Sequence, residues 1–283
     1  MLGKLIKHDF KALGRILWPT NIAVVAAGAV MAILMTVSLR FNANPNAAAG
    51  AKTVIAAMTG IPMVLIALGI MASMLLTLLV VCVHYYKNFM GDEGYLTFTL
   101  PVKSATLLWS KLLTGFFWML INAAAIAIAV LLVLFFGTST KGLIDPDLLT
   151  AISKLPIIGQ RLNEYADAIG LTLLTLAAWL MSILSQVLKV FLAVTIGGMI
   201  AKNHKLLASI GMYFVVNIVS GVVKWVVRLA FGVGFFAMGA TDALDGVSAA
   251  QSLLVYGIGS SLVFAALYFL ISERILTKRL NLQ

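Results

Sequence analysis

The chain has 283 residues, of which 62% are hydrophobic and only 11% are charged, and its mean hydropathy is +1.06. Soluble domains carry about 25% charged residues, so this composition excludes an ordinary soluble protein and predicts an all-α polytopic membrane protein. The net charge of +10 does not indicate nucleic-acid binding, because the basic residues are dispersed among hydrophobic runs. The single cysteine, Cys82, excludes an internal disulfide and a thiolate-rich metal site.

Residues 1–16 have the pattern of an amphipathic helix that lies in the membrane interface, with apolar residues at three- and four-residue steps on one side. Basic residues recur on the other side: Lys4, Lys7, Lys11 and Arg15. The charge-free run that follows, Ile16 to Leu39, has 24 residues, whereas a cleavable signal peptide has an apolar run of roughly 7–15. We therefore expect a retained first span at about 17–39.

Five further apolar stretches are long enough to cross a bilayer, for which about 20 residues suffice. They lie at about 61–84, 112–136, 170–200, 206–228 and 252–272. With the first span they predict six transmembrane helices in a single transmembrane domain, residues 1–283. The run Leu229 to Gly239 is too short for another crossing, and we expect a re-entrant or interfacial segment there.

The polar segment between the second and third spans, residues 87–111, has an ordered character. Two glycines bracket two carboxylates, an apolar stretch follows, a proline stops any preceding helix, and Ser104 can cap a new one. The residues concerned are Gly91, Asp92, Glu93, Gly94, Tyr95, Leu96, Phe98, Leu100 and Pro101. The pattern fits a docking surface for a partner, and it fits equally a solvated loop whose apolar residues rest on lipid headgroups.

The stretch GDEGYLTFTLPV, Gly91 to Val102, resembles the intracellular loop of permease subunits of ABC-2 type exporters from bacteria. The resemblance implies a type V exporter-like transmembrane domain and a short coupling helix on which a separate ATPase subunit docks. It also implies a second permease subunit, identical or homologous, with ATP and Mg²⁺ bound by the ATPase. The implied coupling residues are Gly91, Asp92, Glu93, Gly94, Tyr95, Leu96, Phe98 and Pro101.

The distribution of basic residues predicts the orientation. Twelve of the 20 Lys and Arg residues flank the spans on the side that holds both termini and residues 87–111, five lie on the other side, and three lie within or near spans. Positively charged loops favour the cytoplasm. We therefore expect a bacterial plasma-membrane protein whose termini and coupling segment all lie in the cytoplasm. Residues 137–167 are expected outside the cell, and Asp145-Pro146 marks the start of a helix there.

The sequence contains no recognisable catalytic constellation. His8, His84 and His204 lie at predicted membrane edges without a second ligand at metal spacing. The stretch that begins at Gly137 lacks the register of a phosphate-binding loop. We therefore expect no metal, no cofactor and no enzymatic activity in this chain, and ATP hydrolysis would belong to a partner subunit.

Polar residues inside the predicted spans are the candidates for a substrate path, because such residues are costly in lipid. They are Asn122 in the third span, Gln186 and Lys189 in the fourth, and Asn217, Ser220, Lys224 and Arg228 in the fifth. The fifth-span residues follow one another at three- and four-residue steps. The alternative is that the amides join helices and that Lys224 and Arg228 extend toward the headgroups.

Composition predicts only the membrane topology; the resemblance implies the permease subunit of an ATP-driven ABC exporter that surrounds the path as a dimer in the lipid membrane. The first alternative is a non-transporting assembly or sensor protein that uses the same loop to bind a cytoplasmic partner. A secondary transporter is a further alternative, although all ten acidic residues fall outside the predicted span centres. The sequence does not define the substrate.

Overall fold

The computed structural model describes residues 2–42, 49–91, 104–137, 166–201, 205–237 and 246–280, and they form six long helices. These are α1 (Leu2–Asn42), α2 (Ala49–Phe89), α4 (Ser104–Gly137), α7 (Ala166–Ile200), α8 (Lys205–Ala237) and α9 (Gly246–Leu280). Each contains a stretch that is long and apolar enough to cross a membrane. The chain is therefore a multi-pass helical membrane protein, as its composition predicts.

The helices extend beyond the predicted spans. The expected interfacial helix and first span are one continuous helix, α1, which accommodates Pro19 in its interior. A re-entrant or interfacial segment is expected after Arg228; the re-entrant option is wrong as far as Ala237, because α8 continues to that residue without a break. No proline interrupts this run, and transmembrane helices tolerate glycine more readily than soluble ones do. The predicted external segment, residues 137–167, lies outside the described residues except at Gly137, where α4 ends, and at 166–167, where α7 begins.

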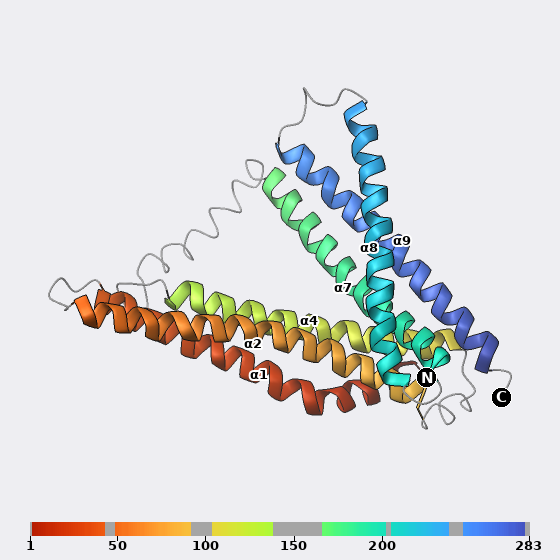
Figure 1. Cartoon of the computed structure of the whole chain (residues 1–283), viewed down its shortest axis with the longest axis horizontal. Helices are drawn as coiled ribbons and strands as arrows, with labels where there is room; N and C mark the ends of the chain where they lie inside the picture. Colours follow the sequence, from red (N-terminus) through yellow and green to blue (C-terminus); the bar gives the residue numbers. More distant parts are fainter. Residues whose placement is uncertain are drawn as a thin grey trace. The chain divides into compact units, whose positions relative to one another are not determined.

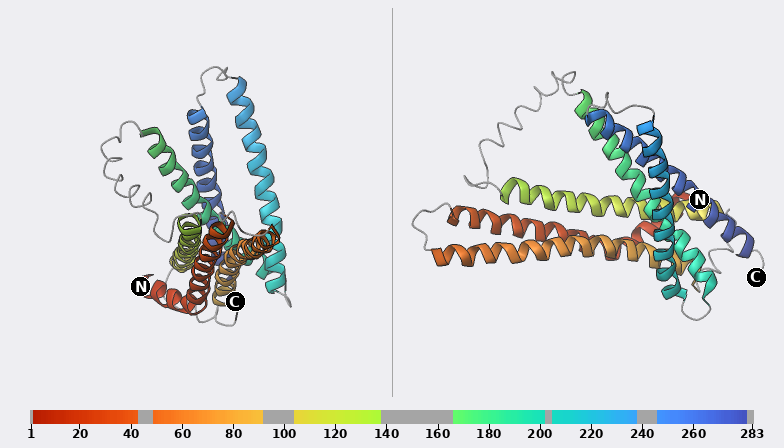
Figure 2. Two further views of the ribbon diagram at one scale, coloured as in Figure 1. Left: turned by 90° about the vertical axis from the view of Figure 1, so that its left-hand side faces the viewer. Right: turned by 45° about the horizontal axis from the view of Figure 1, so that its top comes forward.

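The chain divides into two compact units, and α1, α2 and α4 each contribute to both. Unit 2 consists of His8–Val80 and Phe117–Leu162, and its helical segments run side by side (Figure 2). Leu13, Leu17 and Trp118 form its buried core cluster, and the Trp118 ring stacks on Phe10 with 4.7 Å between centroids. α1 and α4 approach closely at Gly28, where an added Cβ would lie 2.6 Å from the Ala129 Cβ. A small residue is therefore needed at this contact.

Unit 1 consists of Met1–Lys7, Val81–Phe116 and Asn163–Gln283, and α7 is its central helix. α7 packs against both α8 and α9 (Figure 1). In the membrane-spanning window of α7, 67% of the residues are buried, against 11% in α8 and 17% in α9. A polar residue on α7 therefore has to find its partner within the protein, whereas most of α8 faces outward.

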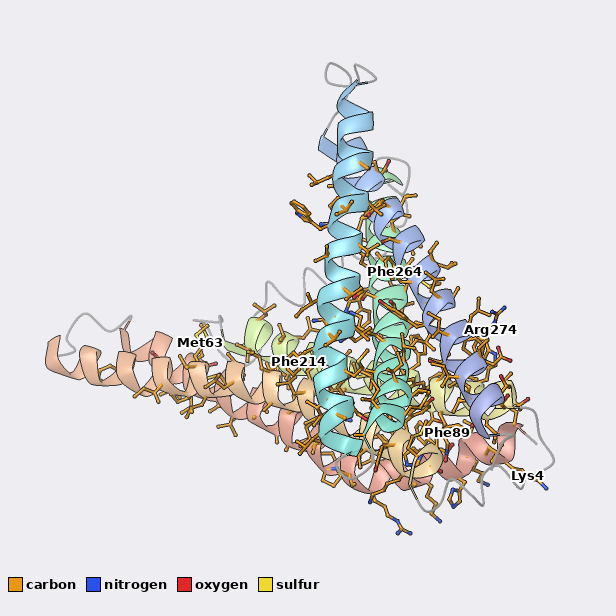
Figure 3. All side chains as sticks on the ribbon, turned by 45° about the vertical axis from the view of Figure 1, so that its right-hand side comes forward. Lys4, Met63, Phe89, Phe214, Phe264 and Arg274 are labelled. Atoms are coloured by element: carbon orange, nitrogen blue, oxygen red, sulfur yellow. The ribbon has the colours of Figure 1, made fainter. Side chains whose placement is uncertain are left out.

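The end of α2, the start of α4, the junction of α7 with α8 and the end of α9 gather at one end of unit 1 (Figure 1). Phe89 and Arg274 mark this end in Figure 3, and Phe264 lies further along α9. This arrangement fits helices that cross the membrane in alternating directions. The helix ends that flank the predicted coupling loop are thus on the same side as the α7–α8 junction.

Candidate functional site

Two polar contacts join α7 to α8 inside unit 1. The Gln186 side-chain amide donates a hydrogen bond to the Tyr213 hydroxyl, and the Lys189 ammonium donates one to the Asn217 side-chain oxygen at 3.0 Å. The Lys189 side chain is only 8% exposed. The helices can approach because α7 carries Gly197, where a Cβ would lie 2.4 Å from the Ser209 Cα.

Two further cations lie where α8 meets α9. The Lys224 ammonium stands 4.9 Å from the centroid of the Phe264 ring, and the Arg228 guanidinium stands 5.8 Å from that of Tyr256. The Tyr256 hydroxyl donates a hydrogen bond to the Lys224 carbonyl at 3.1 Å. A cation over an aromatic face gains about 0.5–1 kcal/mol when exposed and about 2 kcal/mol or more when desolvated. The rings therefore hold both cations without neutralising them.

We call Lys189, Lys224 and Arg228 the cationic seam. Asn217 on α8 lies level with Lys189 on α7. At 1.5 Å per residue, Lys224 lies about 10 Å along α8 from Asn217, and Arg228 lies about 6 Å beyond Lys224. Among the described residues, no carboxylate forms an ion pair with any of the three. A lysine at the centre of a spanning helix costs about 2.5–3.5 kcal/mol on insertion scales. Within the part of the chain that the structure describes, the three cations therefore have neutral partners only, a feature that packing does not explain.

Two further predicted path residues, Ser220 on α8 and Asn122 on α4, make contacts that involve no cation. Ser220 is buried, and its hydroxyl donates to the Asn217 carbonyl within α8 itself. Asn122 belongs to unit 2, where its side-chain amide donates to the Asn21 oxygen at 2.9 Å and the two residues are 1% and 4% exposed. This geometry favours helix–helix packing for Asn122, so its role as a path residue stays a prediction without support.

Of the predicted coupling residues, the structure describes Gly91 alone. Its N–H donates to the Tyr86 carbonyl at 3.0 Å, and an added Cβ would lie 2.9 Å from the Lys87 carbonyl, so glycine is needed where α2 ends. The other predicted coupling residues lie outside the described residues: Asp92, Glu93, Gly94, Tyr95, Leu96, Phe98 and Pro101.

The two helices that lead into the coupling segment are joined by a contact that sequence reasoning missed. The Lys111 ammonium on α4 donates to the Asn88 side-chain oxygen on α2 at 3.0 Å, and the Asn88 amide donates to the His84 carbonyl at 2.8 Å. We call the Asn88–Lys111 pair the loop root. Lys111 is 6% exposed, although its place before an apolar run predicts a basic flank at the membrane surface.

Aromatic contacts connect the loop root region to α7. The ring of Tyr85 on α2 stacks on Phe191 with 4.0 Å between centroids and an interplanar angle of 9°. The Tyr85 hydroxyl lies 3.0 Å from that of Thr195. Tyr85 and Phe191 are almost fully buried. The Tyr85–Phe191 stack and the Tyr85–Thr195 pair therefore join the end of α2 to α7, the helix that also carries Lys189.

The chain matches no protein-family model, and neither the curated proteins nor the solved structures contain a significant match to it. The function must therefore be argued from its own residues and from the resemblance of its loop sequence.

Proposed function

We propose that this chain is the membrane-spanning permease subunit of an ATP-driven exporter of the ABC-2 type. It pairs with a second permease subunit, identical or homologous, to enclose a substrate path. A separate ATPase subunit, which binds ATP and Mg²⁺, docks on the loop between α2 and α4 from the cytoplasm of a bacterial cell. The cationic seam and Asn217 contribute to the path.

The observation that carries this proposal is that both sides of the coupling loop and the cationic seam belong to one compact unit. Residues 81–91 and 104–116 flank the loop, and both stretches lie in unit 1 with α7, α8 and α9. The loop root ties the two flanks together, and the Tyr85–Phe191 stack ties them to α7. A displacement of the loop by a docked ATPase would therefore reach α7, the helix that carries Lys189, because close-packed interiors transmit strain.

The test is to co-purify this chain with an ATPase encoded beside it and to measure ATP hydrolysis in reconstituted vesicles. The double change Asp92→Ala, Glu93→Ala should lower binding of the ATPase or uncouple hydrolysis from transport, since loss of one partner of a buried charge pair typically costs about 2–5 kcal/mol. Glu273→Ala is the matched control, because it removes a carboxylate from α9, outside the loop.

Two results would overturn the proposal. Normal ATPase binding and normal hydrolysis in the double variant would mean that the loop only rests on headgroups. A protein that binds a cytoplasmic partner through the loop but never moves a substrate would instead be an assembly or sensor protein.

A further inference from the structure

Extension of a long side chain toward the membrane surface does not explain Lys189, the buried cation of the seam. Lys189 lies 11 residues before the end of α7 at Ile200, or about 16 Å at 1.5 Å per residue. A lysine stem is too short to cover this distance. Lys189 is moreover buried against α8 and bonded to Asn217 rather than extended along the lipid.

The neutral partners of the seam leave its charge available. An ammonium has three donors, and the Asn217 oxygen accepts one from Lys189. Lys224 and Arg228 each stand over an aromatic ring, which attracts a cation but accepts no proton and carries no net charge. Among the described residues the seam therefore combines two ammonium groups and a guanidinium group with neutral partners, and such cations bind a phosphate or a carboxylate.

The surroundings of the seam on α8 are apolar. Asn217 is followed by Ile218, which is 66% exposed, and Lys224 by Trp225, which is 62% exposed. Phe214 is 60% exposed and lies on the side of α8 away from α9 (Figure 3). A ligand whose anionic head lies on the seam would therefore find apolar side chains beside it for a hydrocarbon tail.

We infer that the cationic seam binds the phosphate or carboxylate headgroup of an anionic amphiphile whose apolar part lies along α8. The steps of about 10 and 6 Å between successive cations, at 1.5 Å per residue, would let one headgroup pass from one positive charge to the next. The inference rests on the proposed function for its assignment of this amphiphile as cargo. The binding itself requires only the seam. A resident lipid of the bilayer has the same headgroup chemistry as a transported amphiphile and would bind in the same way.

The binding test uses the full-length chain in nanodiscs made of phosphatidylcholine with a small fraction of phosphatidylglycerol. Native mass spectrometry compares how much of each lipid the protein retains. The wild type should retain phosphatidylglycerol preferentially, and Lys224→Gln with Arg228→Gln should reduce this preference by about tenfold, the effect of losing a charge-assisted hydrogen bond. Arg274→Gln, which removes an exposed cation from α9, should leave it unchanged.

Lys189→Met measures the contribution of the buried cation to the phosphatidylglycerol preference separately from that of the other two. Lys189→Arg keeps the positive charge and should retain most of the preference that Lys189→Met loses. The elution profile on gel filtration identifies any variant that fails to fold. If Lys189→Met fails to fold, the double variant Lys224→Gln, Arg228→Gln still tests the lipid preference. Equal retention of the two lipids by the wild type, or an unchanged preference in the double variant, would overturn the inference.

The source of the amphiphile is decided by adding the ATPase subunit and a fluorescent phosphatidylglycerol. ATP-dependent movement of this probe across the bilayer, lost in the double variant, would identify the amphiphile as cargo. Selective retention without ATP-dependent movement would identify a resident lipid and still support the seam as its binding site. The lipid-retention arm uses neither the loop nor the ATPase, so failure of the inference there is distinct from failure of the Asp92 and Glu93 test.

Discussion

The contact between Asn21 and Asn122 in unit 2 and the cationic seam in unit 1 place polar groups inside spanning helices in two different ways. The amide pair is neutral, almost fully buried and held by a hydrogen bond of 2.9 Å. The seam carries three positive charges, each held by a neutral group, and Arg228 is exposed. Helix packing accounts for the first arrangement, because the hydrogen bond joins α1 to α4, although the buried Asn21 side-chain nitrogen has no hydrogen-bond partner among the described residues. Helix packing does not account for the second.

Depth in the membrane therefore does not by itself identify a functional residue. Asn122 and Asn217 are predicted at similar depths, yet one joins two helices in unit 2 and the other accepts a hydrogen bond from a buried lysine. The net charge of the contact and the exposure of its partners distinguish them. Each contact can be altered separately by substitution.

The largest effect is expected from Gly197→Val, which separates α7 from α8 and so breaks the seam. An added Cβ would overlap the Ser209 backbone at 2.4–2.6 Å, and backbone atoms cannot move aside as a side-chain tip can. We expect a loss of more than about 3 kcal/mol of stability, the upper range for overpacking, measured as a lower thermal midpoint in detergent. Gly211→Val on α8, where nothing lies within 4 Å, is the control, and equal losses in both would contradict the prediction.

A smaller effect is expected from Lys111→Met, which breaks the loop root but leaves the seam intact. The change removes a hydrogen bond from a charged donor to Asn88, typically worth about 1.5–3 kcal/mol, and methionine fills much of the same space. We expect the ATPase still to bind, with transport per ATP hydrolysed reduced several-fold. Lys87→Met removes an exposed cation from α2 and serves as the control; normal coupling in Lys111→Met would show that the loop root has no part in it.

The smallest effect is expected from Asn122→Leu in unit 2. Hydrogen bonds between spanning helices average about 0.6 kcal/mol and reach about 1.7 kcal/mol, so the thermal midpoint should fall slightly. Transport should not change, because the amide pair carries no charge and is buried. A large loss of transport at normal stability would indicate that Asn122 lines the substrate path. The amide pair and the cationic seam would then no longer differ in function.

The number and the approximate positions of the spanning helices could be predicted, because uncharged apolar runs of about 20 residues are typical of membrane-spanning helices. The helix ends could not. Hydropathy reports where the hydrocarbon layer stops, whereas backbone hydrogen bonding continues until a residue interrupts it. For this reason α1 runs without a break through the expected interfacial boundary near residue 16, and α8 continues past Arg228.

The candidate site was predictable along each helix but not between helices. The three- and four-residue spacing of Asn217, Ser220, Lys224 and Arg228 identified one face of α8. The rotation of α7 that brings Lys189 to Asn217, and the aromatic partners on α9, depend on packing that no local pattern encodes. The burial of Lys111 was missed for the same reason, since a lysine before an apolar run usually lies at the membrane surface.

The close approach of α7 and α8 at Gly197 bears on how the chain enters the membrane during synthesis. A translocon that releases α7 alone would expose Lys189 to lipid, at a cost of about 2.5–3.5 kcal/mol for a lysine at the helix centre. α8 begins at Lys205, five residues after α7 ends at Ile200, so the two emerge almost together. Release of α7 and α8 as a hairpin lets Asn217 reach Lys189 before either helix meets the hydrocarbon. The glycine thus makes a buried cation compatible with biogenesis.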